Sequence, residues 1–154
     1  MTLHELLALF TSKNIEYTTA HLDAVDQNAQ LTDVASDSRE VTPGSLFVCK
    51  GASFSPAYLA SAVEAGAVAY LCQQSLAEEL QAVAPNVAAI HVDDVRLAMA
   101  YAAAGVAGHP DKKLTTIGIT GTKGKSTCSY MLRAILDGDE PYSKCGVIGG
   151  IEVF

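Results

Sequence analysis

Apolar and polar residues alternate along the first half of the chain with the spacing of helices and strands. Four large apolar residues recur three or four positions apart near the start: Leu3, Leu6, Leu7 and Phe10. This spacing predicts an amphipathic helix over residues 3–13, ending near Asn14. The polar segment DVASDSREVTPG (33–44) then leads through a Pro-Gly turn into the β-rich run SLFVC (45–49), which is predicted to form a strand.

Helical and extended patterns continue to alternate after this strand. The predicted elements are a helix over 56–65 closed by Gly66, a strand over 67–72, a helix from Ser75, a strand over 87–92, and a helix from Asp93 or Asp94 to about 107. Ser75 and Glu78 have the spacing of a capping box. Strands that alternate with helices indicate a sheet covered by helices, so the predicted fold class is α/β.

The polar segment GHPDKK (108–113) is predicted to link two domains, 1–108 and 109–154. Beyond it, the pattern predicts a buried strand over 114–120, a glycine-rich turn, a helix over 125–137 ended by Gly138, and a strand from Cys145 to the last residue. One apolar stripe follows this helix: Cys128, Met131, Leu132, Ile135 and Leu136. A single strand–helix–strand unit cannot bury its own apolar surface, so the second domain is expected to be truncated.

Charge and composition narrow the classes of partner. The chain has 10 Lys and Arg against 17 Asp and Glu, which gives a net charge of −7 and argues against binding to nucleic acid or to anionic membranes. The start, MTLHELLALF, lacks the features of a signal peptide, and no apolar run approaches the length of a membrane span, so a cytoplasmic location is expected. The four cysteines, Cys49, Cys72, Cys128 and Cys145, are spread among apolar residues and are interpreted as free core thiols.

A glycine-rich loop joins the strand predicted at 114–120 to the helix predicted at 125–137. Its sequence is GITGTKGKST (118–127). Glycines allow successive backbone N–H groups to converge on an anion, and the following helix adds its own free N–H groups and the positive end of its dipole. In such a loop Lys125 would contact the β- and γ-phosphates of a triphosphate, and the Ser126 hydroxyl would bind Mg²⁺.

The predicted ATP-binding residues are therefore Gly121, Thr122, Lys123, Gly124, Lys125, Ser126 and Thr127, with Ser126 also the predicted metal ligand. The side chain of Lys123, like those of Lys112 and Lys113, is interpreted as a surface charge. The spacing departs from the general Walker motif, which has glycine at the position of Ile119. The alternative interpretation is that the glycines form only a tight turn.

Two segments carry a resemblance to a known family. TGTKGKST (120–127) resembles the ATP-binding loop of the Mur ligases, which join amino acids to UDP-N-acetylmuramic acid through an acyl phosphate. Upstream, SDSREVTPGSLFVCKGASFSPAYLASAVEAGAVAYL (36–71) is similar to the UDP-binding segment of the muramyl-tripeptide synthetases of this family. The resemblance implies a small UDP-MurNAc-binding domain at 1–108, followed by the first β-α-β unit of a P-loop central domain.

The resemblance also implies substrate-binding residues. Carried over by position, the contacts with UDP-MurNAc fall on Ser36, Ser38, Ala52, Ser53 and Phe54. Asp37 and Arg39, which flank Ser38, are interpreted either as ligand contacts or as a local salt bridge that shapes the loop.

The function implied is the N-terminal part of an ATP-dependent ligase. Such a ligase adds an amino acid, L-lysine rather than meso-diaminopimelate, to UDP-N-acetylmuramoyl-L-alanyl-D-glutamate. It uses ATP and Mg²⁺, and it is expected to be a monomer whose partners are the UDP-MurNAc-dipeptide and the amino acid. Because an amino-acid-binding domain and most of the ATPase domain of the family have no counterpart here, this chain alone is expected to be inactive.

Three alternatives remain open. The first is a fragment of the Mur ligase that adds D-Ala-D-Ala. The second is a non-catalytic UDP-sugar-binding module, and the third is a general P-loop NTPase.

Overall fold

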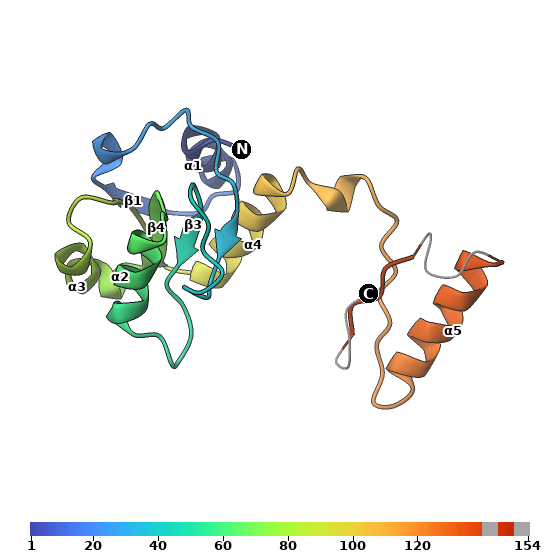
Figure 1. Cartoon of the computed structure of the whole chain (residues 1–154). Helices are drawn as coiled ribbons and strands as arrows, with labels where there is room; N and C mark the ends of the chain where they lie inside the picture. The colour runs from blue at the N-terminus through green and yellow to red at the C-terminus, as the bar shows by residue number, and fades with distance from the viewer. Residues whose placement is uncertain (140–144, 150–154) are drawn as a thin grey trace. The chain divides into compact units, whose positions relative to one another are not determined.

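The computed structural model describes residues 1–139 and 145–149 (Figure 1). The chain divides into two compact units, Met1–Leu114 and Thr115–Phe154.

The first unit is built on one five-stranded sheet. Its strands are β1 (Tyr17–Ala20), β2 (Val34–Ala35), β3 (Leu46–Val48), β4 (Ala69–Gln73) and β5 (Ala88–Val92). They lie in the order β1-β5-β4-β3-β2, and all neighbours are parallel except β1, which runs antiparallel to β5. The predicted α/β class is confirmed for this unit.

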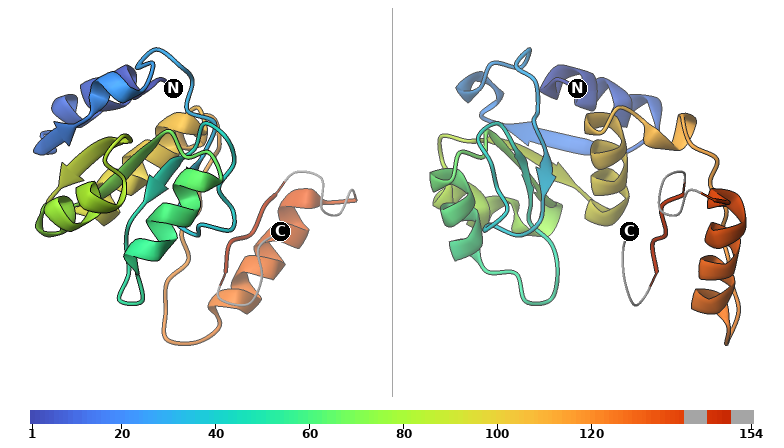
Figure 2. Two further views of the ribbon diagram at one scale, coloured as in Figure 1. Left: turned by 60° about the vertical axis from the view of Figure 1, so that its left-hand side comes forward. Right: turned by 45° about the vertical axis from the view of Figure 1, so that its right-hand side comes forward.

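Helices cover both faces of this sheet (Figure 2). They are α1 (Leu3–Ser12), α2 (Pro56–Glu64), α3 (Ala77–Val83) and α4 (Val95–Val106), with short 3₁₀ turns at Leu22–Ala24, Gln74–Leu76 and Pro110–Lys112. Because successive side chains of a strand point to opposite faces, the sheet contributes apolar side chains to two hydrophobic cores, one on each face. Val48, Leu71 and Ile90 pack with residues of α1 and α4, whereas Phe47 and Tyr70 pack with residues of α2 and α3.

The helix starts agree only partly with the prediction. The side chain of Asp94 accepts a hydrogen bond from the backbone N–H of Leu97 at 2.9 Å and caps α4, which agrees with the predicted start. The capping box predicted at Ser75 is wrong, because Ser75 lies inside a 3₁₀ turn and α3 starts after Leu76 without a side-chain cap. The start of α3 is instead determined by packing, because Ala77 and Leu80 are buried.

The second unit contains α5 (Lys125–Asp137), which begins and ends where the pattern predicts. Its buried residues are Arg133 and Asp137, which form an ion pair at 3.4 Å. One carboxylate oxygen of Asp137 accepts a hydrogen bond from the backbone N–H of Cys145 at 2.9 Å. The charged face of α5 is therefore the one that packs within this unit.

The apolar stripe of α5 is exposed instead. Met131 is 63% exposed and Ile135 is 76% exposed. Cys128 is exposed as well, so the interpretation of it as a core thiol is wrong, whereas Cys49 and Cys72 are buried as predicted. An exposed stripe agrees with the inference that this unit cannot cover its own apolar surface.

The strand predicted over residues 114–120 is also wrong. These residues have no strand assignment, and Leu114 and Ile117 are 69% and 54% exposed. An extended segment becomes a strand only when a neighbour accepts and donates its ladder hydrogen bonds, and the described residues of this unit contain no strand that does so. Of the predicted C-terminal strand, residues 145–149 show a single bridge at Ile148, and residues 150–154 lie outside the described residues.

Candidate functional site

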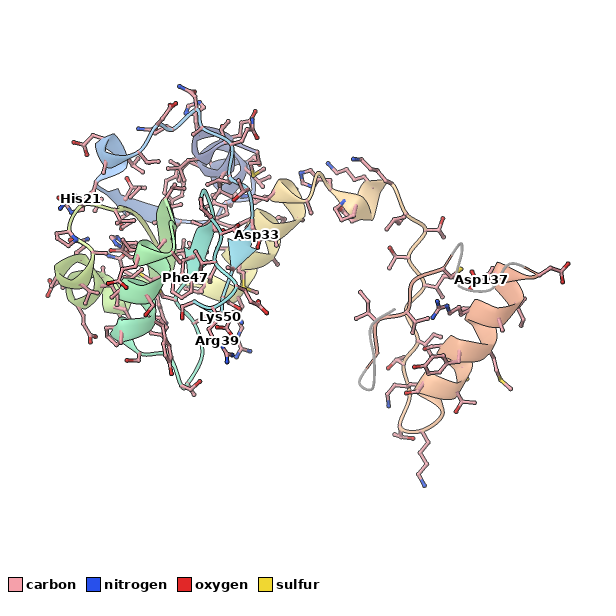
Figure 3. All side chains as sticks on the ribbon, viewed as in Figure 1. His21, Asp33, Arg39, Phe47, Lys50 and Asp137 are labelled. Atoms are coloured by element: carbon pink, nitrogen blue, oxygen red, sulfur yellow. The ribbon has the colours of Figure 1, made fainter. Side chains whose placement is uncertain are left out.

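Two of the predicted substrate loops meet at one edge of the sheet. Ser36 follows β2 and Lys50 lies two residues after β3, and these strands are parallel neighbours with Ala35 opposite Phe47. The carboxyl ends of parallel strands point to the same edge, where open α/β sheets bind their ligands. Figure 3 shows Arg39 and Lys50 at this edge. The fold therefore brings the DSR segment together with the loop after β3.

The DSR segment is braced by an ion pair between its first and last residues. The Nε of Arg39 donates to Asp37 Oδ1 at 2.9 Å, and the backbone N–H of Arg39 donates to the same oxygen at 3.0 Å. The side-chain hydrogen bond from Arg39, more than any other cause, lowers the pKa of Asp37 to about 2. This geometry supports the interpretation of the pair as a local salt bridge. Between the two, Ser38 is half-buried, and Ser36 just before them is exposed.

The loop between β3 and α2 presents two exposed residues and an aromatic ring. Ala52 and Ser53 are exposed, while Phe54 is half-buried. The ring of Phe54 packs edge to face against the ring of Tyr58, which lies in the first turn of α2. The ring centroids are 6.5 Å apart, and the angle between the ring planes is 70°. Tyr58 is absent from the residues predicted from the sequence. The signal was present, because a helix was predicted to start at residue 56, between Phe54 and Tyr58, and this places Tyr58 in its first turn.

The glycine-rich loop of the second unit ends in a conformation that favours glycine. Gly124 has φ of 78° and directly precedes α5. A Cβ atom added to it would meet no other atom within 4 Å. The first backbone bond of the helix runs from the N–H of Cys128 to Gly124 O at 2.9 Å. Within the described residues, the N–H groups of Lys125, Ser126 and Thr127 therefore have no hydrogen-bond partner.

The side chains of this loop lie close to those free N–H groups. Lys125 Nζ donates to the backbone oxygen of Gly121 at 2.6 Å, which folds its ammonium group back over the loop. Ser126 is half-buried, whereas Thr122, Lys123 and Thr127 are exposed. The side chain of Lys123 is exposed, as expected of a surface charge. The whole predicted ATP-binding set thus belongs to one exposed turn and the start of one helix.

A metal ion would find few protein ligands at this loop. Among residues 1–139 and 145–149 there is no group of three His, Cys, Asp or Glu side chains that could hold one. The hydroxyl of Ser126 fits a Mg²⁺ that keeps most of its ligands as water and phosphate oxygens, which is how this ion commonly binds.

A separate polar network lies around His91 on β5, next to the edge strand β1. The Thr18 hydroxyl donates to Gln74 Oε1 at 2.9 Å and lies 3.3 Å from His91 Nδ1, and Gln81 Nε2 lies 3.4 Å from His91 Nε2. A neutral imidazole with its proton on Nδ1 satisfies all three contacts. Burial lowers the pKa of His91. Thr18, Gln74 and His91 also line an open depression of about 660 Å³ that the sequence did not predict.

No helix among the described residues is long and apolar enough to cross a membrane.

Known proteins with similar sequences are named as members of the Mur ligase family, the family that the sequence motifs resemble. The UDP-N-acetylmuramyl-tripeptide synthetase of Latilactobacillus sakei is 41% identical over 111 residues, which are 72% of this chain and 20% of that relative. The UDP-N-acetylmuramoyl-L-alanyl-D-glutamate–L-lysine ligase of Enterococcus faecalis is 39% identical over 119 residues, 76% of this chain and 22% of that relative. The chain is therefore homologous to the Mur ligases.

Other comparisons set the limits of this homology. No protein-family model matches the chain. The chain spans about a fifth of the length of the Mur ligases it matches. A 2,6-diaminopimelate ligase of Caldanaerobacter subterraneus is also similar, with 38% identity over 127 residues, 81% of this chain and 25% of that relative. The names of the relatives thus include both the lysine and the diaminopimelate enzymes.

Proposed function

We propose that the chain is the N-terminal part of an ATP-dependent Mur ligase that adds an amino acid to UDP-N-acetylmuramoyl-L-alanyl-D-glutamate. In this proposal, residues 1–108 bind the UDP part of the substrate and residues 109–154 begin the ATP-binding domain. The whole enzyme acts in the cytoplasm as a monomer, and this chain alone binds ligands without ligating them. L-lysine is proposed as the amino acid because KGASF and TGTKGKST resemble the lysine-adding enzymes.

The observation that carries the ATP half is the free helix start after Gly124. Three successive N–H groups, at residues 125–127, have no acceptor in the described part of the chain, and they follow a glycine in the left-handed region. Unpaired N–H groups at a helix start, backed by the helix dipole, favour a phosphate group. The ammonium of Lys125 is 2.6 Å from the Gly121 oxygen and would exchange this contact for phosphate oxygens.

The residues present fit ATP with Mg²⁺ at this loop. ATP, when bound, supplies the phosphoryl group that activates a carboxylate for attack by an amine. The loop N–H groups would bind and orient the phosphates, Lys125 would neutralise their charge, and the Ser126 hydroxyl would bind the metal ion. Gly124 leaves the space next to its Cα open, so a phosphate can approach the backbone closely.

The UDP half is supported by the meeting of two loops at one sheet edge. Ser38 is half-buried beside the braced Asp37–Arg39 pair, and Ser53 is exposed in the neighbouring loop. Hydroxyl and backbone groups on such loops can bind the uracil edge and the diphosphate. Lys50, at the same edge, adds a positive charge in a chain whose net charge is −7.

Calorimetric titration of the purified chain tests the two halves separately. UDP and UDP-MurNAc-dipeptide should each release heat and raise the melting temperature, and MgATP should do so independently. The variant Ser38→Ala should weaken UDP alone, and Lys125→Ala should weaken MgATP alone. Absence of heat and of any thermal shift with millimolar UDP-MurNAc-dipeptide would refute the proposed substrate.

A further inference from the structure

Tyr58 is a large aromatic residue that the core does not use. It lies in the first turn of α2, and 48% of its surface is exposed, whereas Leu59 beside it is fully buried. Its position places it at the carboxyl edge of β3, four residues after Phe54. An exposed tyrosine at a ligand-binding edge has a ring available for another partner.

One aromatic neighbour packs against the ring of Tyr58. Phe54 meets it edge to face, with 70° between the two planes, so the pair forms an open aromatic corner. The DSR segment follows β2, the loop that leads into α2 follows β3, and these two strands are parallel neighbours. Tyr58 and the DSR segment therefore belong to the same edge of the sheet.

The segments at this edge of the sheet supply different parts of a nucleotide site. The DSR segment offers the Ser38 hydroxyl for hydrogen bonds to a base edge. Lys50 places a positive charge at the same edge of the sheet, near Arg39, whose guanidinium is paired with Asp37 (Figure 3). The aromatic corner supplies what these groups lack, which is a flat apolar surface. In proteins that bind single-stranded nucleic acids, bases commonly stack on such aromatic side chains.

We infer that Tyr58 stacks against the base of a pyrimidine nucleoside diphosphate and thereby selects ligands with a planar base. This inference rests on the proposed UDP site and adds a residue that the sequence resemblance did not supply. Phe54 holds the tyrosine ring in place, and the ring itself contacts the base. The diphosphate lies toward Lys50.

A pair of ligands isolates the stacking contact. Uridine diphosphate has a planar aromatic base, and 5,6-dihydrouridine diphosphate keeps the same hydrogen-bonding edge on a puckered, saturated ring. The wild-type chain should bind uridine diphosphate at least about 5-fold more tightly than the dihydro form, measured by calorimetry, because base stacking on an aromatic side chain contributes at this level. In Tyr58→Ala this preference should disappear.

Two further variants separate stacking from folding. Tyr58→Phe keeps the ring and should keep the preference for the planar base. Tyr101→Ala removes a tyrosine of α4, whose ring lies under Lys13 on the other face of the sheet, and should leave both affinities unchanged. Melting temperatures of all variants establish that they are folded.

The possible results are distinct. If the wild-type chain binds neither nucleotide, the proposed UDP site is refuted. If it binds both but Tyr58→Ala retains the wild-type preference for the planar base, the UDP site stands and the role of Tyr58 is refuted. Loss of the preference in both Tyr58→Ala and Tyr58→Phe would also refute stacking, because it would point to the hydroxyl group instead.

Discussion

Replacing Gly66 with alanine measures how tightly the turn after α2 packs against the entry to β3. Gly66 has φ of 103°, and its backbone oxygen accepts a hydrogen bond from the N–H of Gly44 at 3.0 Å. A methyl group on Gly66 would lie 3.0 Å from Pro43 Cα and 3.3 Å from Pro43 Cβ. The nearest of these atoms belongs to the backbone, so relief requires the turn itself to move.

Gly51 provides a matched control. Its φ of 100° is nearly the same, but a methyl group there would meet nothing within 4 Å. Both substitutions force alanine into a region that favours glycine, at a cost of about 1–3 kcal/mol each. Both also reduce the freedom of the unfolded chain by the same amount, so this effect cancels in the comparison.

Only Gly66→Ala adds the clash with Pro43. Overpacking of this kind costs about 1–3 kcal/mol, so Gly66→Ala should be less stable than Gly51→Ala by that amount. With an m-value of about 2 kcal/mol/M, the urea midpoint followed by circular dichroism should be lower by about 0.5–1.5 M for Gly66→Ala than for Gly51→Ala. Equal midpoints, or a lower midpoint for Gly51→Ala, would show that the clash is not felt.

Three other predictions test single interactions. Because burial lowers the pKa of His91 below its unfolded value of about 6.5, its contribution to stability is complete above that pH and is lost as the pH falls below it. Urea titrations between pH 8 and pH 5 should therefore show a decline in unfolding free energy that is smaller in His91→Gln; an identical decline would contradict the assignment. Asp94→Ala removes the cap of α4 and should cost about 1 kcal/mol, against less than about 0.5 kcal/mol for exposed Asp93→Ala, compared by thermal unfolding. Lys125→Ala should weaken MgATP binding at least about 10-fold in calorimetry, while Lys123→Ala should change it less than about 3-fold. Equal effects of the two substitutions would argue against a contact between the Lys125 ammonium and the phosphates.

The sequence determined the elements whose signals are local. The helix α5 lies at Lys125–Asp137 as predicted, because a glycine precedes it, a glycine ends it, and its residues follow the helical period. The start of α4 was readable to within one residue, as Asp93 or Asp94, because a capping carboxylate binds a backbone N–H of its own helix and needs no distant partner. The three segments of the proposed sites were also predicted from the sequence, because the glycine and hydroxyl residues of each segment are close together in the chain.

Tertiary structure decided what depends on partners far away in the sequence. β2 is two residues long and exists because Val34 and Ala35 pair with Leu46 and Phe47, and the predicted strand at 114–120 is absent where no such pairing occurs. On α5, Arg133 is buried and paired with Asp137 while Ile135 is 76% exposed, which reverses the order expected from hydrophobicity. Local propensity acts through the backbone of each residue, whereas ladder pairing and burial depend on which segments the fold brings together.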